Sequence, residues 1–85
     1  GKPIKRGTAL PPADAALAER LRAWRRTEAQ AQGVPAYVIF SDATLVEIAA
    51  LRPASRMALA EVNGIGAKKL ERYGEAVLAV VAAEG

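Results

Sequence analysis

The chain has 85 residues, a formal net charge of +3 and 52% hydrophobic residues, of which few are aromatic. This length allows one domain with a modest core. The chain contains no cysteine and no histidine, which excludes disulfide stapling, zinc sites built from Cys or His, and Cys/His catalysis.

Alanine is abundant and strand-forming residues are sparse, so the composition predicts an all-α fold. No apolar run approaches the ~18 residues of a membrane span. The basic first residues are not followed by the apolar stretch of a secretion signal. We therefore expect a soluble intracellular domain without a membrane partner.

The positive charge is concentrated at one end of the chain. Three of the 12 cations, Lys2, Lys5 and Arg6, lie in the first six residues, and the nine that remain are balanced by the nine acidic residues. The rest of the chain is formally neutral, so it can bind phosphate only if its cations cluster on one surface.

Residues 1–12 are predicted to form a flexible basic linker, because they combine glycines, prolines and cations with little that can be buried. The folded domain is expected over residues 13–85. Its first helix is predicted over residues 13–31, where Leu17, Leu21 and Trp24 form a narrow apolar stripe at helical spacing. We expect Trp24 to be a core anchor.

Gly33 should end this helix, and Pro35 should keep it from restarting at once. The run 35–40 that follows is the one strand-like segment, and it has no second run to pair with. It is therefore predicted to be an apolar linker or a short 3₁₀ turn. Two interpretations of Tyr37 remain open: a half-buried tyrosine, or a platform on which an unpaired base stacks.

Two further helices are predicted in the middle of the chain. Ser41 is a candidate N-cap for a helix that runs to about Leu51, where Pro53 stops it. Ser55 is a candidate N-cap for a short helix that runs to about Val62.

A glycine turn follows at residues 64–66. Gly64 suits the left-handed conformation in which a helix often ends, and Ile65 can then place its side chain in the core. Gly66 opens the next helix without a Cβ, so the backbone there can lie close to another surface.

The start of this next helix is a candidate phosphate site. The free N–H groups of its first turn and the helix dipole attract anions, and Lys68, Lys69 and Arg72 add positive charge. A tight turn between two helices, with no binding role, is the alternative interpretation. A P-loop is excluded because no Ser or Thr follows Gly-Lys, and a dinucleotide fingerprint because residue 69 is not glycine.

The last part of the chain is predicted to form two helices, over residues 66–73 and 75–83, with a break at Gly74. The sequence thus predicts a compact five-helix bundle with a short 3₁₀ segment between the first two helices.

These features, in this order, resemble the HRDC domain, the helicase-and-RNase-D C-terminal module. The resemblance covers about residues 13–83 and is most similar to the HRDC domains of bacterial RecQ-type DNA helicases, with RNase D and other helicases as alternative hosts. It is carried by two groups of residues: Leu21, Trp24-Arg25 and the run 33–45 in the first half, and Pro53, Ser55, Leu59, Val62, Gly64-Ile65-Gly66, Lys69-Leu70-Glu71 and Tyr73-Gly74 in the second.

The resemblance implies an accessory module that binds single-stranded or branched DNA weakly and without sequence preference. It would help to target an ATP-dependent helicase in DNA repair and recombination, and the catalytic parts would lie outside this chain. A monomeric domain without catalytic residues, metal or cofactor is expected, in the bacterial cytoplasm and associated with the nucleoid. The implied DNA-binding residues are Tyr37, Gly64, Ile65, Gly66, Lys68, Lys69 and Arg72.

The neutral charge of the folded part favours an alternative on the same fold. In this alternative the domain is a protein-interaction or autoregulatory docking module of the same helicase, and it has little affinity for DNA.

Overall fold

The computed structural model describes residues 12–84, and over this range the chain forms five helices and no strand. The predicted all-α, five-helix fold is therefore confirmed, and none of the described helices is long and apolar enough to cross a membrane. The linker predicted for residues 1–12 lies outside the described residues except for Pro12. The helices are α1 (Pro12–Gln32), α2 (Ala36–Ile39), α3 (Asp42–Leu51), α4 (Arg56–Ala60) and α5 (Ala67–Glu84).

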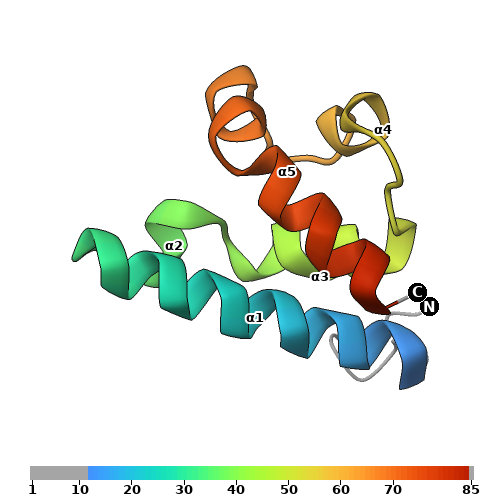
Figure 1. Cartoon of the computed structure of the whole chain (residues 1–85), viewed down its shortest axis with the longest axis horizontal. Helices are drawn as coiled ribbons and strands as arrows, with labels where there is room; N and C mark the ends of the chain where they lie inside the picture. Colours follow the sequence, from blue (N-terminus) through green and yellow to red (C-terminus); the bar gives the residue numbers. More distant parts are fainter. Residues whose placement is uncertain (1–11, 85) are drawn as a thin grey trace.

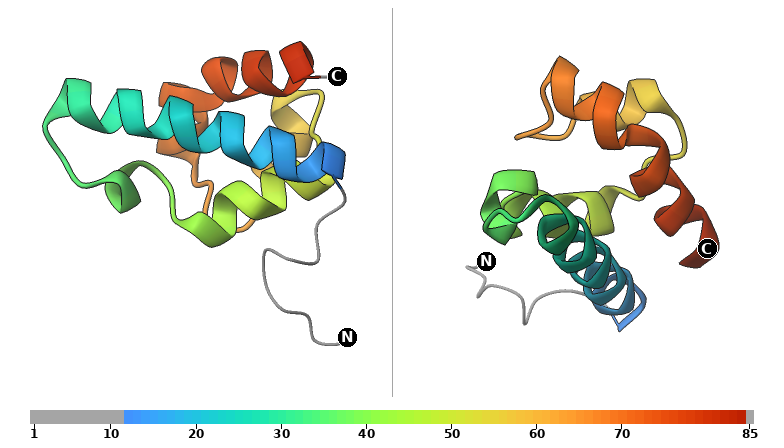
Figure 2. Two further views of the ribbon diagram at one scale, coloured as in Figure 1. Left: turned by 90° about the horizontal axis from the view of Figure 1, so that it is seen from below. Right: turned by 60° about the vertical axis from the view of Figure 1, so that its left-hand side comes forward.

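The longest helix, α1, forms one side of the molecule, and α2, α3 and α5 all pack against it (Figure 1). The short helix α2 lies near the C-terminal end of α1. Helix α4 packs on α5, and the second part of α5 returns to α1 (Figure 2). The core between these helices is formed by fully buried apolar side chains. The largest are Leu17, Leu21, Ile39, Phe40, Leu45, Ile48, Leu59 and Val77.

Three aromatic rings, from three different parts of the chain, pack together at one edge of this core. The ring centroid of Trp24 lies 6.0 Å from that of Phe40 and 5.7 Å from that of Tyr73, and the last two are 5.7 Å apart. We call Trp24, Phe40 and Tyr73 the aromatic cluster. Trp24 packs against the buried core as predicted, but its own side chain is half-buried rather than enclosed.

The strand-like run forms a single helical turn. Within α2 the N–H of Val38 donates to the carbonyl of Pro35, three residues back, and that of Phe40 donates to Ala36, four residues back. The turn therefore carries both a 3₁₀-type and an α-type bond, and it is assigned as α-helix. It buries Ile39 and leaves Tyr37 and Val38 exposed.

The predicted break at Gly74 is wrong, because α5 continues through this residue to Glu84. The ribbon of α5 instead changes direction between its orange and red parts (Figure 1). Gly74 is buried, and a Cβ on it would lie 3.2 Å from Cδ1 of Leu70 and 3.7 Å from Nη1 of Arg56. A glycine inside a helix costs only about 1 kcal/mol relative to alanine, and the buried side chains of Tyr73 and Val77 on either side offset this. The glycine therefore lies inside a continuous helix and does not end it.

The glycine turn is held by a chain of hydrogen bonds that begins at the N-cap of α3. The hydroxyl of Ser41 accepts from the backbone N–H of Thr44, as expected for an N-cap. Because a carbonyl only accepts, the Thr44 hydroxyl donates to the carbonyl of Asn63 at 3.1 Å, and the Ser41 hydroxyl donates to Thr44 at 3.0 Å. Gly64 follows with a φ of +93°, which confirms its predicted left-handed conformation.

The two glycines of the turn should respond differently to alanine. In Gly64→Ala, a Cβ would collide with the Thr44 hydroxyl, and the positive φ would be strained, so we expect a loss of about 2 kcal/mol or more. In the matched control Gly66→Ala, the Cβ meets nothing within 4 Å, and the loss should stay below about 1 kcal/mol. Urea unfolding of both variants measures the difference, and equal losses would contradict this account of the turn.

Candidate functional site

Tyr37 is the most exposed aromatic residue of the described chain. It is 72% exposed on the outer side of α2, whereas Ile39 and Phe40, which follow it, are buried. This exposure is not compatible with the half-buried interpretation of Tyr37. The stacking interpretation stays a prediction, and the ring is accessible to a planar group.

The glycine turn brings its own backbone to the surface next to the start of α5. Gly64 and Gly66 are exposed, while the side chain of Ile65 is only 8% exposed and belongs to the core, as predicted. Ile65 can therefore contribute only backbone atoms to a binding site. The residue before α5 is Gly66, which has no side chain to cap the first turn, in contrast to Ser41 and Ser55 at α3 and α4.

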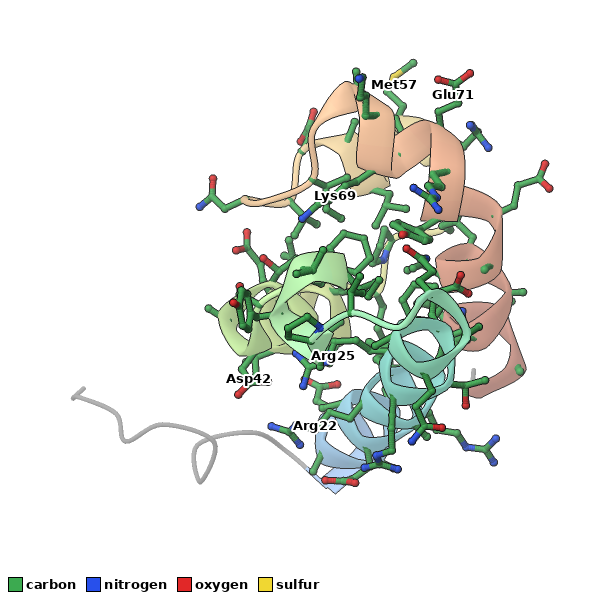
Figure 3. All side chains as sticks on the ribbon, turned by 90° about the vertical axis from the view of Figure 1, so that its left-hand side faces the viewer. Arg22, Arg25, Asp42, Met57, Lys69 and Glu71 are labelled. Atoms are coloured by element: carbon green, nitrogen blue, oxygen red, sulfur yellow. The ribbon has the colours of Figure 1, made fainter. Side chains whose placement is uncertain are left out.

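The three predicted cations all lie in the first two turns of α5, with two of them over the aromatic cluster. The Nζ atom of Lys69 lies 5.4 Å from the centre of the Phe40 ring, and the guanidinium carbon of Arg72 lies 5.5 Å from the centre of the Tyr73 ring. Lys68 is exposed. Figure 3 shows that Lys69 extends into the space between the start of α5 and the helices below it, away from Met57 and Glu71.

Among residues 12–84, no ion pair joins Lys68, Lys69 or Arg72 to a carboxylate. Four ion pairs among the described residues engage arginines elsewhere: Arg22–Glu19, Arg25–Asp42, Arg52–Asp14 and Arg56–Glu75. Although the folded part is formally neutral, the start of α5 therefore carries a net positive charge, with three cations and one acid, Glu71, in residues 67–72.

The predicted site residues thus come from two places. The glycine turn and the three cations form one continuous segment, and Tyr37 comes from α2. Phe40 connects the two, because its backbone ends α2 and its ring lies under Lys69.

Sequence reasoning missed the contribution of Arg25, which appeared only as part of the family resemblance. From α1, this side chain donates to the carbonyl of Phe40 at 2.9 Å and pairs with Asp42 at 2.8 Å. One signal was available in the sequence: Arg25 lies four residues after Leu21, on the apolar side of the helix.

The groups that this surface presents are cations and an aromatic ring. Both serines are occupied as N-caps, and among residues 12–84 no group of three His, Cys, Asp or Glu side chains could hold a metal ion. An exposed aromatic ring can stack on a planar group, and the cations at the start of α5 can attract an anion.

The chain belongs to the HRDC domain family, whose sequence profile matches residues 14–81. This confirms the resemblance drawn from the motifs.

Two groups of bacterial helicases contain similar segments. The chain is 50% identical over 68 residues to the ATP-dependent DNA helicase UvrD2 of Mycobacterium tuberculosis, covering 80% of this chain and 10% of that protein. It is 40% identical over 68 residues to the ATP-dependent DNA helicase RecQ of Haemophilus influenzae, covering 80% of this chain and 11% of that protein. In these helicases the HRDC domain is an accessory domain, and the catalytic activity lies elsewhere in the protein.

The solved structure of D. radiodurans RecQ HRDC domain 3 has the same fold. The TM-score is 0.80 at 41% sequence identity, and the match covers 82% of this chain and 92% of that one. The likeness to RecQ therefore holds at the level of structure as well as sequence.

Lys68 and Lys69 provide a matched pair of variants. Lys69→Gln should lower the free energy of unfolding by about 0.5–1 kcal/mol, because it removes the cation from the Phe40 ring. Lys68→Gln removes the same charge from the same helix turn and should leave stability within about 0.5 kcal/mol of the unchanged protein. Equal effects in urea unfolding would show that the contact between Lys69 and Phe40 contributes nothing to stability.

Proposed function

We propose that this chain is a nucleic-acid-binding accessory domain of an ATP-dependent DNA helicase of the RecQ or UvrD2 kind. It binds single-stranded or branched DNA weakly and without sequence preference, and it helps to target the helicase. The observation that carries the proposal is the exposed ring of Tyr37 together with the unpaired cations of α5, which are connected through Phe40.

The ring of Tyr37 and the cations of α5 would contact different parts of a nucleic acid. Every base has a π-face, so stacking on Tyr37 is favourable for any sequence. Lys68, Lys69 and Arg72 offer charge to phosphates, which position a strand but carry no sequence information. Three cations and one exposed ring form a small site, in keeping with weak binding.

The parent protein is proposed from the relatives. The matched 68 residues correspond to 10–11% of the length of the UvrD2 and RecQ helicases, so the helicase motor would lie outside this chain. A monomeric domain within such a protein, in the bacterial cytoplasm at the nucleoid, is the setting that we propose, with roles in DNA repair and recombination.

A second candidate function is docking of a protein, or of other domains of the parent helicase. The specific observation in its favour is the exposure of two large apolar side chains, Leu51 at the end of α3 and Met57 on α4, of which Met57 is 80% exposed. Flexible methionine side chains are common at protein-binding surfaces. In this alternative the domain has little DNA affinity.

A salt series separates the folded site from the basic N-terminal segment. Each neutralised phosphate of a single strand adds about −0.7 to the log–log slope of affinity against salt, so three cations contribute about −2. We expect removal of residues 1–10 to weaken binding of a fluorescent oligonucleotide and to flatten the slope from about −4 to about −2. Measurable binding should remain, and fluorescence anisotropy measures both quantities.

The remaining binding should depend on the ring at residue 37. In the truncated chain, Tyr37→Ala should weaken binding by about fivefold or more with little change in slope, because stacking carries little salt dependence. Tyr37→Phe keeps the ring and should retain binding, and Met57→Ala should not affect it. If the truncated chain shows no binding even at low salt, the DNA proposal is wrong and docking takes its place.

A further inference from the structure

Helix α2 is too short to define its own position. It has four residues, and its N-cap residue, Pro35, makes no side-chain hydrogen bond. A single helical turn gains few hydrogen bonds for the backbone freedom it loses, so it is unstable unless other parts of the protein hold it. The place at which Tyr37 is presented must therefore be set by contacts beyond α2.

Besides the packing of Trp24 on the Phe40 ring, one polar side chain of α1 holds the C-terminal end of α2. The Nη1 atom of Arg25 donates to the carbonyl of Phe40, the C-cap residue of α2, at 2.9 Å. Its Nη2 atom lies 2.8 Å from Oδ1 of Asp42, in the first turn of α3. The planar guanidinium thus spans the joint between α2 and α3, as Figure 3 allows the reader to follow.

Arg25 does not behave as a ligand-binding cation. Its side chain is 12% exposed, and its charge is already paired with Asp42. Its Nε atom is buried and has no hydrogen-bond partner among the described residues, which is a cost to the folded state. In return, the hydrogen bond from Arg25 fixes the backbone of Phe40. Phe40 follows Tyr37 by three residues, and its ring lies under the Nζ atom of Lys69.

We infer that Arg25 is a positioning residue of the nucleic-acid site: it holds α2 so that the ring of Tyr37 stays in register with the cations of α5. The inference rests on the proposed function. It assigns to a largely buried arginine on α1 an effect on binding that requires the ring of Tyr37.

A double-mutant cycle on the full chain tests this. The variants are Arg25→Lys, Tyr37→Ala and the two combined, and the probe is a short fluorescent oligothymidylate. Lysine keeps the positive charge but cannot reproduce the two-pronged contact. We expect Arg25→Lys to weaken binding about threefold or more, without changing the salt slope, when Tyr37 is present. In the Tyr37→Ala background the same change should cost less than about 1.5-fold.

Two controls keep the test specific. Arg22→Lys alters a partly exposed arginine on the same helix, paired with Glu19, and should leave binding unchanged. Hydrogen exchange in the absence of DNA should show faster exchange of the Val38 and Phe40 amides in Arg25→Lys, because these amides form the bonds of α2. All binding is measured at a temperature at which circular dichroism shows each variant to be folded.

Different experimental results would contradict the positioning role of Arg25 and the proposed function. Equal weakening by Arg25→Lys in both backgrounds, or no weakening in either, overturns the positioning role while leaving DNA binding intact. Unchanged exchange at Val38 and Phe40 also overturns it. If Tyr37→Ala has no effect on binding, or the unaltered chain does not bind, the proposed function fails and the positioning role fails with it.

Discussion

The contact among the rings of Trp24, Phe40 and Tyr73 is the interaction on which the rest of this structure depends. It joins α1, the joint after α2, and α5, which are distant in the sequence. Because the faces of aromatic rings attract cations, the same packing gives Lys69 and Arg72 places over Phe40 and Tyr73. The two cations therefore lie directly on buried aromatic residues, and the packing of those residues sets the positions of the cations.

Much of this fold could be predicted from local rules. The N-cap at Ser41 and the left-handed conformation of Gly64 depend on a few neighbouring residues, and both were predictable from the sequence. Gly74 was assigned wrongly because the local rule that glycine breaks a helix is outweighed by the burial of the neighbouring side chains of Tyr73 and Val77. Thr44 and Arg25 form bonds over 19 and 15 residues, and no local pattern predicts such partners.

The charge of the domain illustrates why a formal count is a poor guide to binding. The cations from residue 13 onward balance the acids in number, and this argued against a nucleic-acid site. In the folded domain several arginines are paired with carboxylates, and the cations at the start of α5 are not. Which charges form ion pairs depends on the fold. The cations that stay outside ion pairs can therefore be identified only from the three-dimensional structure. The exposure of Tyr37 likewise follows from α2 turning Ile39 inward, which the strand-like pattern did not predict.

The central claim is that Tyr37 and the start of α5 form one surface that binds a single strand. An NMR titration of the ¹⁵N-labelled chain with a short oligonucleotide at low salt tests it most directly, since each backbone amide reports separately. The account predicts that shifts cluster on Tyr37 and on residues 64–72 and move together with one affinity. Shifts confined to residues 1–11, or to Leu51, Met57 and their chain neighbours, would contradict it.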